Sequence, residues 1–258
     1  MPTAMPVSLS PSKLTAFKDC PRAFRFSAID HIPEESSPHL VLGTFVHLAL
    51  QELYEMPSGF RNAWAVNALA AAWAEIERSE DYLALELDWN ATADFCSAAE
   101  RLFSNALRLE DPDTVNVRST EQKLEAVVDG VTYRGIIDRM DFLPEPDGAY
   151  AVIDYKTGRV PDRSKERQKL EGVYFYALLC EQVFGYPPKF VRLDYLADPV
   201  SVTCEVNEQM IRAIRQRAGA AWAAIAAAAE ADDFRPNPSP LCSWCSYRAL
   251  CPLFGGKP

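Results

Sequence analysis

The order of structural signals along the chain predicts an α/β (α+β) fold. Up to about residue 110, apolar residues recur mainly at the three- and four-residue spacing of amphipathic helices. Three strand-like segments then follow in succession, at 118–128, 131–142 and 149–155. A helix, two further strands and a long helix complete the pattern, which indicates a sheet covered by helices.

The N-terminal part is predicted to be helical. Ser10 before Pro11 is a typical helix start, because a serine caps the first turn and proline fits its first position. Apolar residues spaced by three and four predict a helix over 41–54, and Ala-rich segments predict helices at 61–78 and 90–110. We expect a single domain over 8–256, with a helical insertion at 57–112.

Turn signals separate the predicted strands. Asp129-Gly130 is a typical two-residue hairpin turn between the first two strands. The turn-rich segment 143–148 joins the second strand to the third. Downstream, we expect a helix at 165–184 that ends before Gly185. Strands at 189–196 and 200–206 and a helix at 207–231 follow.

Composition limits the classes of function. The chain of 258 residues carries a formal charge of −10, which argues against a generally basic nucleic-acid binder but not against a local groove. Two sequence windows are basic. The window from Lys156 to Lys169 contains six basic and two acidic residues, and the window from Lys13 to Arg25 contains four basic residues and one acidic residue. They also fit solvated faces of an acidic protein. Without an apolar run that could span a bilayer, or a secretory signal, we expect a cytoplasmic protein with no membrane partner.

The segment Ala151-Val-Ile-Asp-Tyr-Lys-Thr-Gly158 carries the strongest chemical signal. Asp154 and Lys156 are two residues apart in a strand, so both side chains point to one face. A carboxylate and an ammonium group in such a buried strand either form a structural ion pair or serve a site. The preceding strand ends in Asp138, and a hairpin would bring Asp138 beside Asp154. Two carboxylates and a lysine suit a divalent cation and a scissile phosphate.

Four of the seven cysteines indicate a metal site. Cys242, Cys245 and Cys251 form a C-x2-C-x5-C pattern near the C-terminus, and Cys20 lies near the other end of the chain. Three thiols within ten residues cannot all form local disulfides of good geometry, and a cytoplasmic setting favours metal. Zinc and an iron–sulfur cluster both accept four thiolates.

Five motifs in order carry a family resemblance: Gly43-x3-His47, Gly135-Ile-Ile-Asp138-Arg139, Asp154-Tyr-Lys156-Thr-Gly158, a tyrosine-bearing helix, and the C-terminal thiols with one early cysteine. The chain resembles the RecB-type branch of the PD-(D/E)XK nuclease superfamily from about Ser8 to Pro252. It is most similar to the members with a four-cysteine [4Fe–4S] cluster, namely AddB-like nuclease domains and CRISPR-adaptation nucleases. The resemblance implies a restriction-endonuclease-like core with a central mixed sheet.

The resemblance also implies roles for individual residues. His47, Asp138, Asp154 and the Tyr155 carbonyl would hold Mg²⁺ or Mn²⁺, and Lys156 would be the catalytic lysine. Glu121 is an accessory acid or a solvated strand-end charge. Cys20, Cys242, Cys245 and Cys251 would hold the cluster, in a cap formed by 234–252 and the Cys20 segment, with zinc as the alternative occupant.

The helix after the lysine departs from the family pattern Q-x3-Y. Its tyrosine is best assigned to Tyr176, but the glutamine position is then Gly172, and Gln168 lies one turn earlier on the same face. The residues expected to contact DNA are Arg22, Arg139, Arg159, Arg163 and Lys165.

The function that the resemblance implies is metal-dependent cleavage of DNA, with single-stranded or end-containing DNA as substrate and an exonuclease role in DNA repair or recombination. The alternatives are a non-catalytic DNA-binding or helicase-partner module with the same fold, and a zinc-stabilised protein of unrelated function. The chain has no Gly-rich ATP-binding loop with a lysine, so any unwinding would come from a helicase partner.

Overall fold

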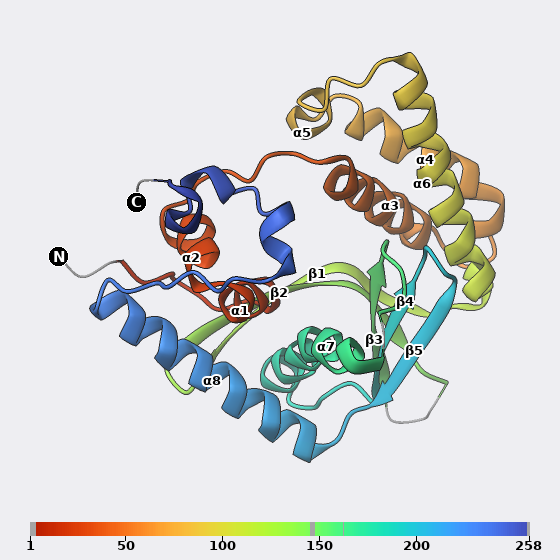
Figure 1. The fold of residues 1–258 in the computed structure, drawn as a ribbon. Helices are drawn as coiled ribbons and strands as arrows, with labels where there is room; N and C mark the ends of the chain where they lie inside the picture. The colour runs from red at the N-terminus through yellow and green to blue at the C-terminus, as the bar shows by residue number, and fades with distance from the viewer. Residues whose placement is uncertain (1–3, 145–147, 162, 257–258) are drawn as a thin grey trace.

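A five-stranded mixed sheet forms the centre of the molecule (Figure 1). This computed structural model describes residues 4–144, 148–161 and 163–256, and only the backbone of 163–171. The strands lie in the order β1-β2-β3-β4-β5, and only β3 and β4 are parallel. Their bounds are β1 Val117–Val128, β2 Val131–Phe142, β3 Tyr150–Lys156, β4 Phe190–Tyr195 and β5 Val200–Glu205. The predicted α/β class with a mixed sheet is confirmed.

The two hairpin predictions also agree with the structure. Asp129 and Gly130 both have positive φ, of 52° and 80°, as a tight hairpin turn between right-twisted strands requires. Strands β2 and β3 are antiparallel, with Arg139 opposite Ile153. The carboxylates of Asp138 and Asp154 therefore belong to adjoining strands, one residue beyond the last regular pair.

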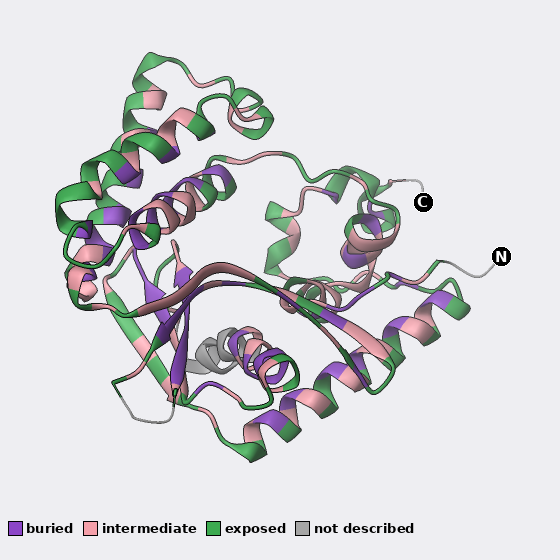
Figure 2. Ribbon diagram, turned by 180° about the vertical axis from the view of Figure 1, so that it is seen from behind, coloured by how far each residue is buried: buried purple, intermediate pink, exposed green. Residues whose placement is uncertain are grey.

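Helices cover both faces of the sheet. On one face lie α3 (Pro38–Glu55), α4 (Arg61–Ile76), the short α5 (Glu80–Leu83) and α6 (Trp89–Leu109), and a second group covers the other face: α7 (Arg163–Phe184), α8 (Glu208–Glu230), α1 (Pro11–Asp19) and α2 (Pro21–Phe24). Alternate residues of β3 divide between the two cores: Ile153 and Tyr155 face α3 and α6, whereas Val152 faces α7 and α8. Figure 2 shows the resulting buried band through β3.

The two ends of the chain form a cap on one side of the sheet (Figure 1). The π-helix η1 (Arg25–Ile29) follows α2, and the C-terminal segment adds three 3₁₀ turns, η3 (Pro240–Trp244), η4 (Arg248–Leu250) and η5 (Pro252–Phe254); a further turn, η2 (Pro112–Thr114), follows α6. The Phe24 and Phe234 rings stack with centroids 6.4 Å apart, and the Asn237 side-chain amide donates to the Asp19 carbonyl oxygen at 2.9 Å. Within the described part of the chain, no helix has both the length and the apolarity needed to cross a membrane.

Candidate active site and thiol-lined cap

Helix α3 and strand β2 bring a histidine and a carboxylate together. His47 Nδ1 lies 3.6 Å from Asp138 Oδ1. Gly43, one helical turn earlier, lies beside the end of β3; a Cβ at this position would make an ordinary contact with Thr157 Oγ1 at 3.6 Å, so the packing does not require a glycine. Burial alone would lower the pKa of His47, but the adjacent Asp138 carboxylate and the charge of Asp154 raise it above the ordinary value.

Glu121 completes a group of three side chains that suits a divalent cation. One ligand atom from each of His47, Glu121 and Asp138 can be chosen so that all three lie within 4.8 Å of one another. Glu121 has φ of +43° in the middle of β1, a conformation that costs non-glycine residues about 1–3 kcal/mol and is concentrated at functional sites. Burial and then the charge of Asp138 raise the pKa of Glu121, a repulsion that a bound cation would relieve. This geometry favours the accessory-acid interpretation over a solvated strand-end charge.

Asp154 and Lys156 form an ion pair on the neighbouring strand. Asp154 is buried, and Lys156 Nζ contacts its Oδ2. Burial raises the pKa of Asp154. Burial alone would lower the pKa of Lys156, but the charge of Asp154 outweighs burial and raises this pKa above the ordinary value. Lys156 is therefore an ammonium group at neutral pH, able to donate hydrogen bonds to a phosphate oxygen or water but not to accept a proton.

The last residues of β3 separate from the middle of β2 where the site forms. Beyond the Arg139–Ile153 pair, the amide N–H of Tyr155 donates to Asp138 Oδ2 at 2.7 Å instead of to a backbone carbonyl. This bond ties the carboxylate of one strand to the residue between Asp154 and Lys156. Among the described residues, the ligand atoms that lie within 4.8 Å of one another come from His47, Asp138 and Glu121, and Asp154 is not part of this group.

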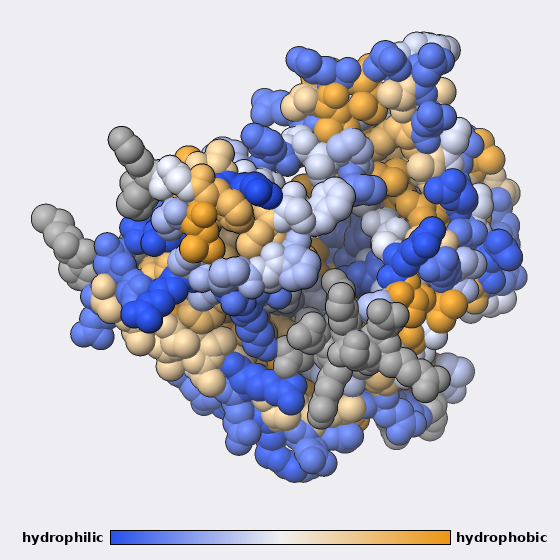
Figure 3. All heavy atoms as spheres, in the orientation of Figure 1, coloured by the Kyte–Doolittle hydropathy of each residue, from blue (hydrophilic) through white to orange (hydrophobic). Residues whose placement is uncertain are grey.

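Two openings give access to these side chains. A cavity of about 730 Å³ is lined by Asp154, Lys156 and Tyr176 together with residues of α1, including Thr15 and Lys18. On the other side, a cavity of about 580 Å³ is lined by His47, Glu121 and Asp138 with residues of α3. Figure 3 shows the surface hollowed between the cap and the α3–α6 side. The carboxylates thus lie between two openings, an arrangement that suits a chain-like substrate.

Tyr176 reaches the larger cavity only because residue 135 is a glycine. A Cβ at Gly135 would lie 2.7 Å from Tyr176 Cε1 and 3.1 Å from Leu179 Cδ1. Burial, followed by the charge of Asp154, raises the pKa of Tyr176, so its hydroxyl stays protonated and can donate into the groove.

We therefore expect Gly135→Ala to destabilise the protein and to displace Tyr176. Overpacking of this kind costs about 1–3 kcal/mol, measurable as a lower midpoint of thermal unfolding. Gly219→Ala in α8 is the matched control, because nothing lies within 4 Å of its added Cβ. A wild-type midpoint for the Gly135 variant would contradict the tight packing.

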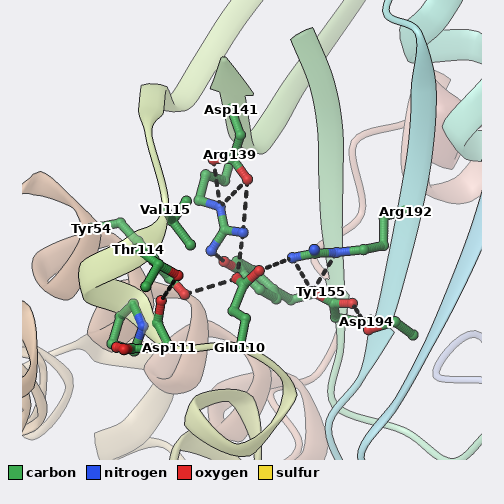
Figure 4. Close-up of polar contacts among 12 residues, drawn as sticks. Tyr54, Glu110, Asp111, Thr114, Val115, Arg139, Asp141, Tyr155, Arg192 and Asp194 are labelled. Carbon is green, nitrogen blue, oxygen red and sulfur yellow. Dashed lines mark hydrogen bonds and ion pairs between the residues drawn. The ribbon is translucent and has the colours of Figure 1, made fainter. Parts of the chain in front are cut away.

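The predicted DNA contacts divide into three groups. Arg159 is exposed just beyond β3, and Arg22 lines the cavity of the cap. The side chains of Arg163, Lys165 and Gln168 lie outside the described residues. The prediction for Arg139 is wrong: its side chain is fully buried on the α3–α6 face and bonded to Glu110, Asp141 and Tyr155, so it cannot meet DNA (Figure 4).

Four cysteines from opposite ends of the chain surround one cavity. A space of about 300 Å³ in the cap is lined by Cys20, Cys242, Cys245 and Cys251. Backbone amides donate to two of the sulfurs, from Asn237 to Cys20 and from Ser239 to Cys242, each at 3.4 Å. Burial raises the pKa of Cys245, and the other three thiols raise it further, as expected for four sulfurs that share one space.

A family comparison agrees with this geometry. The family model described as the PD-(D/E)XK nuclease superfamily matches residues 8–252. The chain belongs to this superfamily. Among curated proteins, none matches.

One solved structure shares the overall fold of this chain. One similar structure is described as a "putative exonuclease" from Eubacterium rectale; it is 12% identical, with a TM-score of 0.59 over 93% of this chain and 88% of that chain. Another, described as SSO0001, is 14% identical with a TM-score of 0.46 over 97% of this chain and 88% of that chain.

The candidate site also has neighbouring residues that the sequence analysis did not single out. Thr15 and Lys18 of α1 line the groove beside Lys156, whereas the sequence analysis had noted only a basic window in this segment. The amphipathic pattern of α1 could not reveal that this helix lines the same cavity as Asp154 and Lys156 of β3. Glu110, at the end of α6, was also missed, because its partners lie far along the chain on β2 and β4.

Proposed function

We propose that this PD-(D/E)XK protein is a metal-dependent DNA nuclease of the RecB type. The observation that carries the proposal is the convergence of His47, Glu121 and Asp138 beside the Asp154–Lys156 pair. Carboxylate oxygens and one imidazole suit Mg²⁺ or Mn²⁺, with the imidazole favouring Mn²⁺. A cytoplasmic role in DNA repair or recombination, with or without a helicase partner, is part of the proposal.

The roles of the residues follow from their charge and position. His47, Glu121 and Asp138 would hold the ion on the α3 side, with Asp154 and the Tyr155 carbonyl beside them. A bound ion would lower the pKa of water and offset charge on the phosphate. Lys156, protonated at neutral pH, would donate hydrogen bonds to the scissile phosphate and steady the charge that develops there. Tyr176 would donate from the wall of the groove.

Metal affinity is expected to depend on His47 ionisation. Because the pKa of His47 is raised, the free protein keeps this proton to a higher pH, and a metal must displace it. Mn²⁺ affinity should therefore fall about tenfold for each pH unit below that pKa. The protonated form stabilises the metal-free fold below the ordinary pKa of about 6.5, and this contribution is lost as pH rises through the raised value.

Isothermal titration of Mn²⁺ between pH 5.5 and 8 measures this dependence. His47→Asn should weaken binding and flatten the pH profile. His39→Asn, at an exposed histidine of the same helix, should leave the profile unchanged. A steep profile retained in His47→Asn would contradict the role of His47.

For the cap, we propose a [4Fe–4S] cluster held by the four cysteines. A tetrahedral zinc site with Zn–S bonds of about 2.3 Å needs sulfurs less than about 4 Å apart. Within the described residues, no three of these thiols fall among the metal-capable groups whose atoms lie within 4.8 Å of one another. This wider spacing supports a multi-iron cluster. Brown anaerobically purified protein with about four iron atoms per chain is expected, whereas colourless protein with stoichiometric zinc would overturn the assignment.

Preference for single-stranded DNA is supported by an exposed indole on the cap. Trp244 is 87% exposed, beside the exposed side chains of Leu241 and Leu253. Figure 3 shows apolar side chains gathered on this cap. The cap cavity and the groove beside Lys156 share the α1 residues Ala16 and Asp19. Indoles stack on unpaired bases with little sequence preference.

Trp244→Ala should weaken binding of single-stranded DNA about tenfold and leave duplex binding within about twofold, since stacking contributes about 1–3 kcal/mol per base. The measurement is fluorescence anisotropy with EDTA present. Trp89→Ala is the matched control, because Trp89 is 85% exposed on α6, away from the cap. Equal losses in both variants would contradict a specific stacking role.

The nuclease proposal is tested by cleavage of end-labelled linear and circular single-stranded DNA and duplex DNA, with Mn²⁺ or EDTA. Metal-dependent products from linear but not circular DNA are expected. Absence of products from a folded, DNA-binding protein would overturn the nuclease in favour of the non-catalytic module.

A further inference from the structure

A buried network of charged residues lies on the α3–α6 side of the sheet (Figure 4). At its centre, Arg139 Nη1 donates to the Tyr155 hydroxyl at 2.7 Å and Nη2 donates to Asp141 Oδ2 at 2.9 Å. The same guanidinium forms an ion pair with Glu110 Oε1, and the Tyr54 hydroxyl donates to that oxygen at 2.9 Å. All three nitrogens of the Arg139 guanidinium thus have an acceptor: Asp141 on the same strand, Tyr155 on β3 and Glu110 after α6.

Glu110 connects this arginine to β4. Its Oε2 accepts from Arg192 Nη2 at 2.7 Å, and Arg192 Nε donates to Asp194 Oδ2 at 3.1 Å. Burial opposes the ionisation of Glu110, but Arg139 and Arg192 prevail and lower its pKa, so it is a carboxylate at neutral pH. One side chain directly after α6 therefore bridges β2 and β4.

The network meets the candidate active site at Tyr155. The hydroxyl of Tyr155 is held by Arg139, and its backbone N–H donates to Asp138 Oδ2 at 2.7 Å. Its ring also stands edge-on to the His47 ring, with centroids 6.0 Å apart. Tyr155 is thus in contact with two of the proposed metal-holding residues.

A second connection runs from α6 to the backbone of Lys156. The buried Asn105 side-chain amide donates to the Leu196 carbonyl oxygen at 2.8 Å, and the Leu196 N–H donates to the Lys156 carbonyl oxygen at 2.8 Å. The end of α6 therefore holds both the Tyr155 side chain and the Lys156 backbone.

We infer that Glu110 and Asn105 are positioning residues, through which the end of α6 sets the geometry of Asp138, Tyr155 and Lys156. The inference rests on the proposed nuclease function. Stability alone is a weak reason for such a network, because apolar residues of similar volume often serve as well as buried ion pairs. A site that must hold its groups to within about 0.5 Å does need rigid support. The helices α4–α6 are thereby coupled to the metal-holding residues.

The test compares Glu110→Gln with Glu100→Gln, an exposed position on the same helix. We expect Glu110→Gln to lower Mn²⁺ affinity and kcat, each by about 10- to 100-fold, as loss of partners behind metal ligands typically does. KM for DNA should stay within about twofold, because the network lies on the sheet face opposite Asp154 and Lys156. Glu100→Gln should match the wild type in all three quantities.

Tyr155→Phe keeps the test valid if Glu110→Gln fails to fold, since it removes one hydroxyl and leaves every charge in place. Lower Mn²⁺ affinity in folded Tyr155→Phe supports the inference. Folded variants with wild-type Mn²⁺ affinity and kcat overturn it. The proposed function is tested separately: it fails if the wild-type protein binds Mn²⁺ but cleaves no DNA. In that case, the difference in Mn²⁺ affinity between the variants would still decide the inference.

Discussion

Lys156→Ala is expected to reduce the single-turnover cleavage rate about 10²- to 10³-fold, the usual cost of removing one donor aimed at a developing negative charge. The ammonium group is held at the groove by Asp154, and its raised pKa keeps it charged at neutral pH. DNA binding measured by anisotropy with Ca²⁺ in place of Mn²⁺ should change much less, because one of several cationic contacts is lost.

Two controls separate this effect from general loss of charge or of folding. Lys123→Ala removes an exposed lysine of β1 and should cleave at the wild-type rate. Removal of Lys156 also leaves Asp154 buried without its cation, which raises the pKa of Asp154 further, so folding of the variant must be checked by circular dichroism. A folded Lys156→Ala protein that cleaves like the wild type would exclude Lys156 from the reaction.

Cys20→Ser is expected to have the largest effect on stability. Cys20 is the only cysteine of the cap that comes from the N-terminal segment, so its loss disconnects α1 and α2 from the C-terminal thiols. A cross-link that closes so long a loop contributes roughly 5 kcal/mol by restricting the unfolded chain. Anaerobic guanidinium denaturation, with iron analysis of the same samples, measures both the free energy of unfolding and the cofactor.

Cys204→Ser is the matched control for this prediction, because Cys204 lies half-buried on β5, outside the cap. It should keep the wild-type iron content and change the free energy of unfolding by less than about 1 kcal/mol. Full iron content and stability in Cys20→Ser would contradict the proposed ligand.

Local signals in the sequence predicted the elements well. The Asp129-Gly130 turn, the helical spacing of α3 and the apolar strands β2 and β3 each depend on residues close together in the chain. Interactions between residues close in the sequence therefore determine these elements. The juxtaposition of Asp138 and Asp154 follows from the β2–β3 hairpin, which is also a local arrangement.

The remaining features depend on contacts that no local pattern encodes. Glu121 turns toward His47 through a positive φ that sequence propensities do not predict for glutamate. Arg139 was assigned to DNA, yet it adjoins Asp138 in β2, and residues adjacent in a strand point to opposite faces. Consistent use of that alternation would have placed it with Tyr155. The partners of Glu110 come from β2 and β4, and only the folded sheet reveals them.

The arrangement of the cap has a consequence for biosynthesis on the ribosome. Helix α1 forms one wall of the groove beside Lys156, and its end is held by Asn237 and, through Phe24 of the next helix, by Phe234. These partners are translated more than two hundred residues after α1. A nascent chain that has already made β2, β3 and α7 can pair Leu9 with β2 and pack α1 against α7, but it still lacks the contacts from Asn237 and Phe234. The wall of the groove is therefore completed only after synthesis has passed the cap.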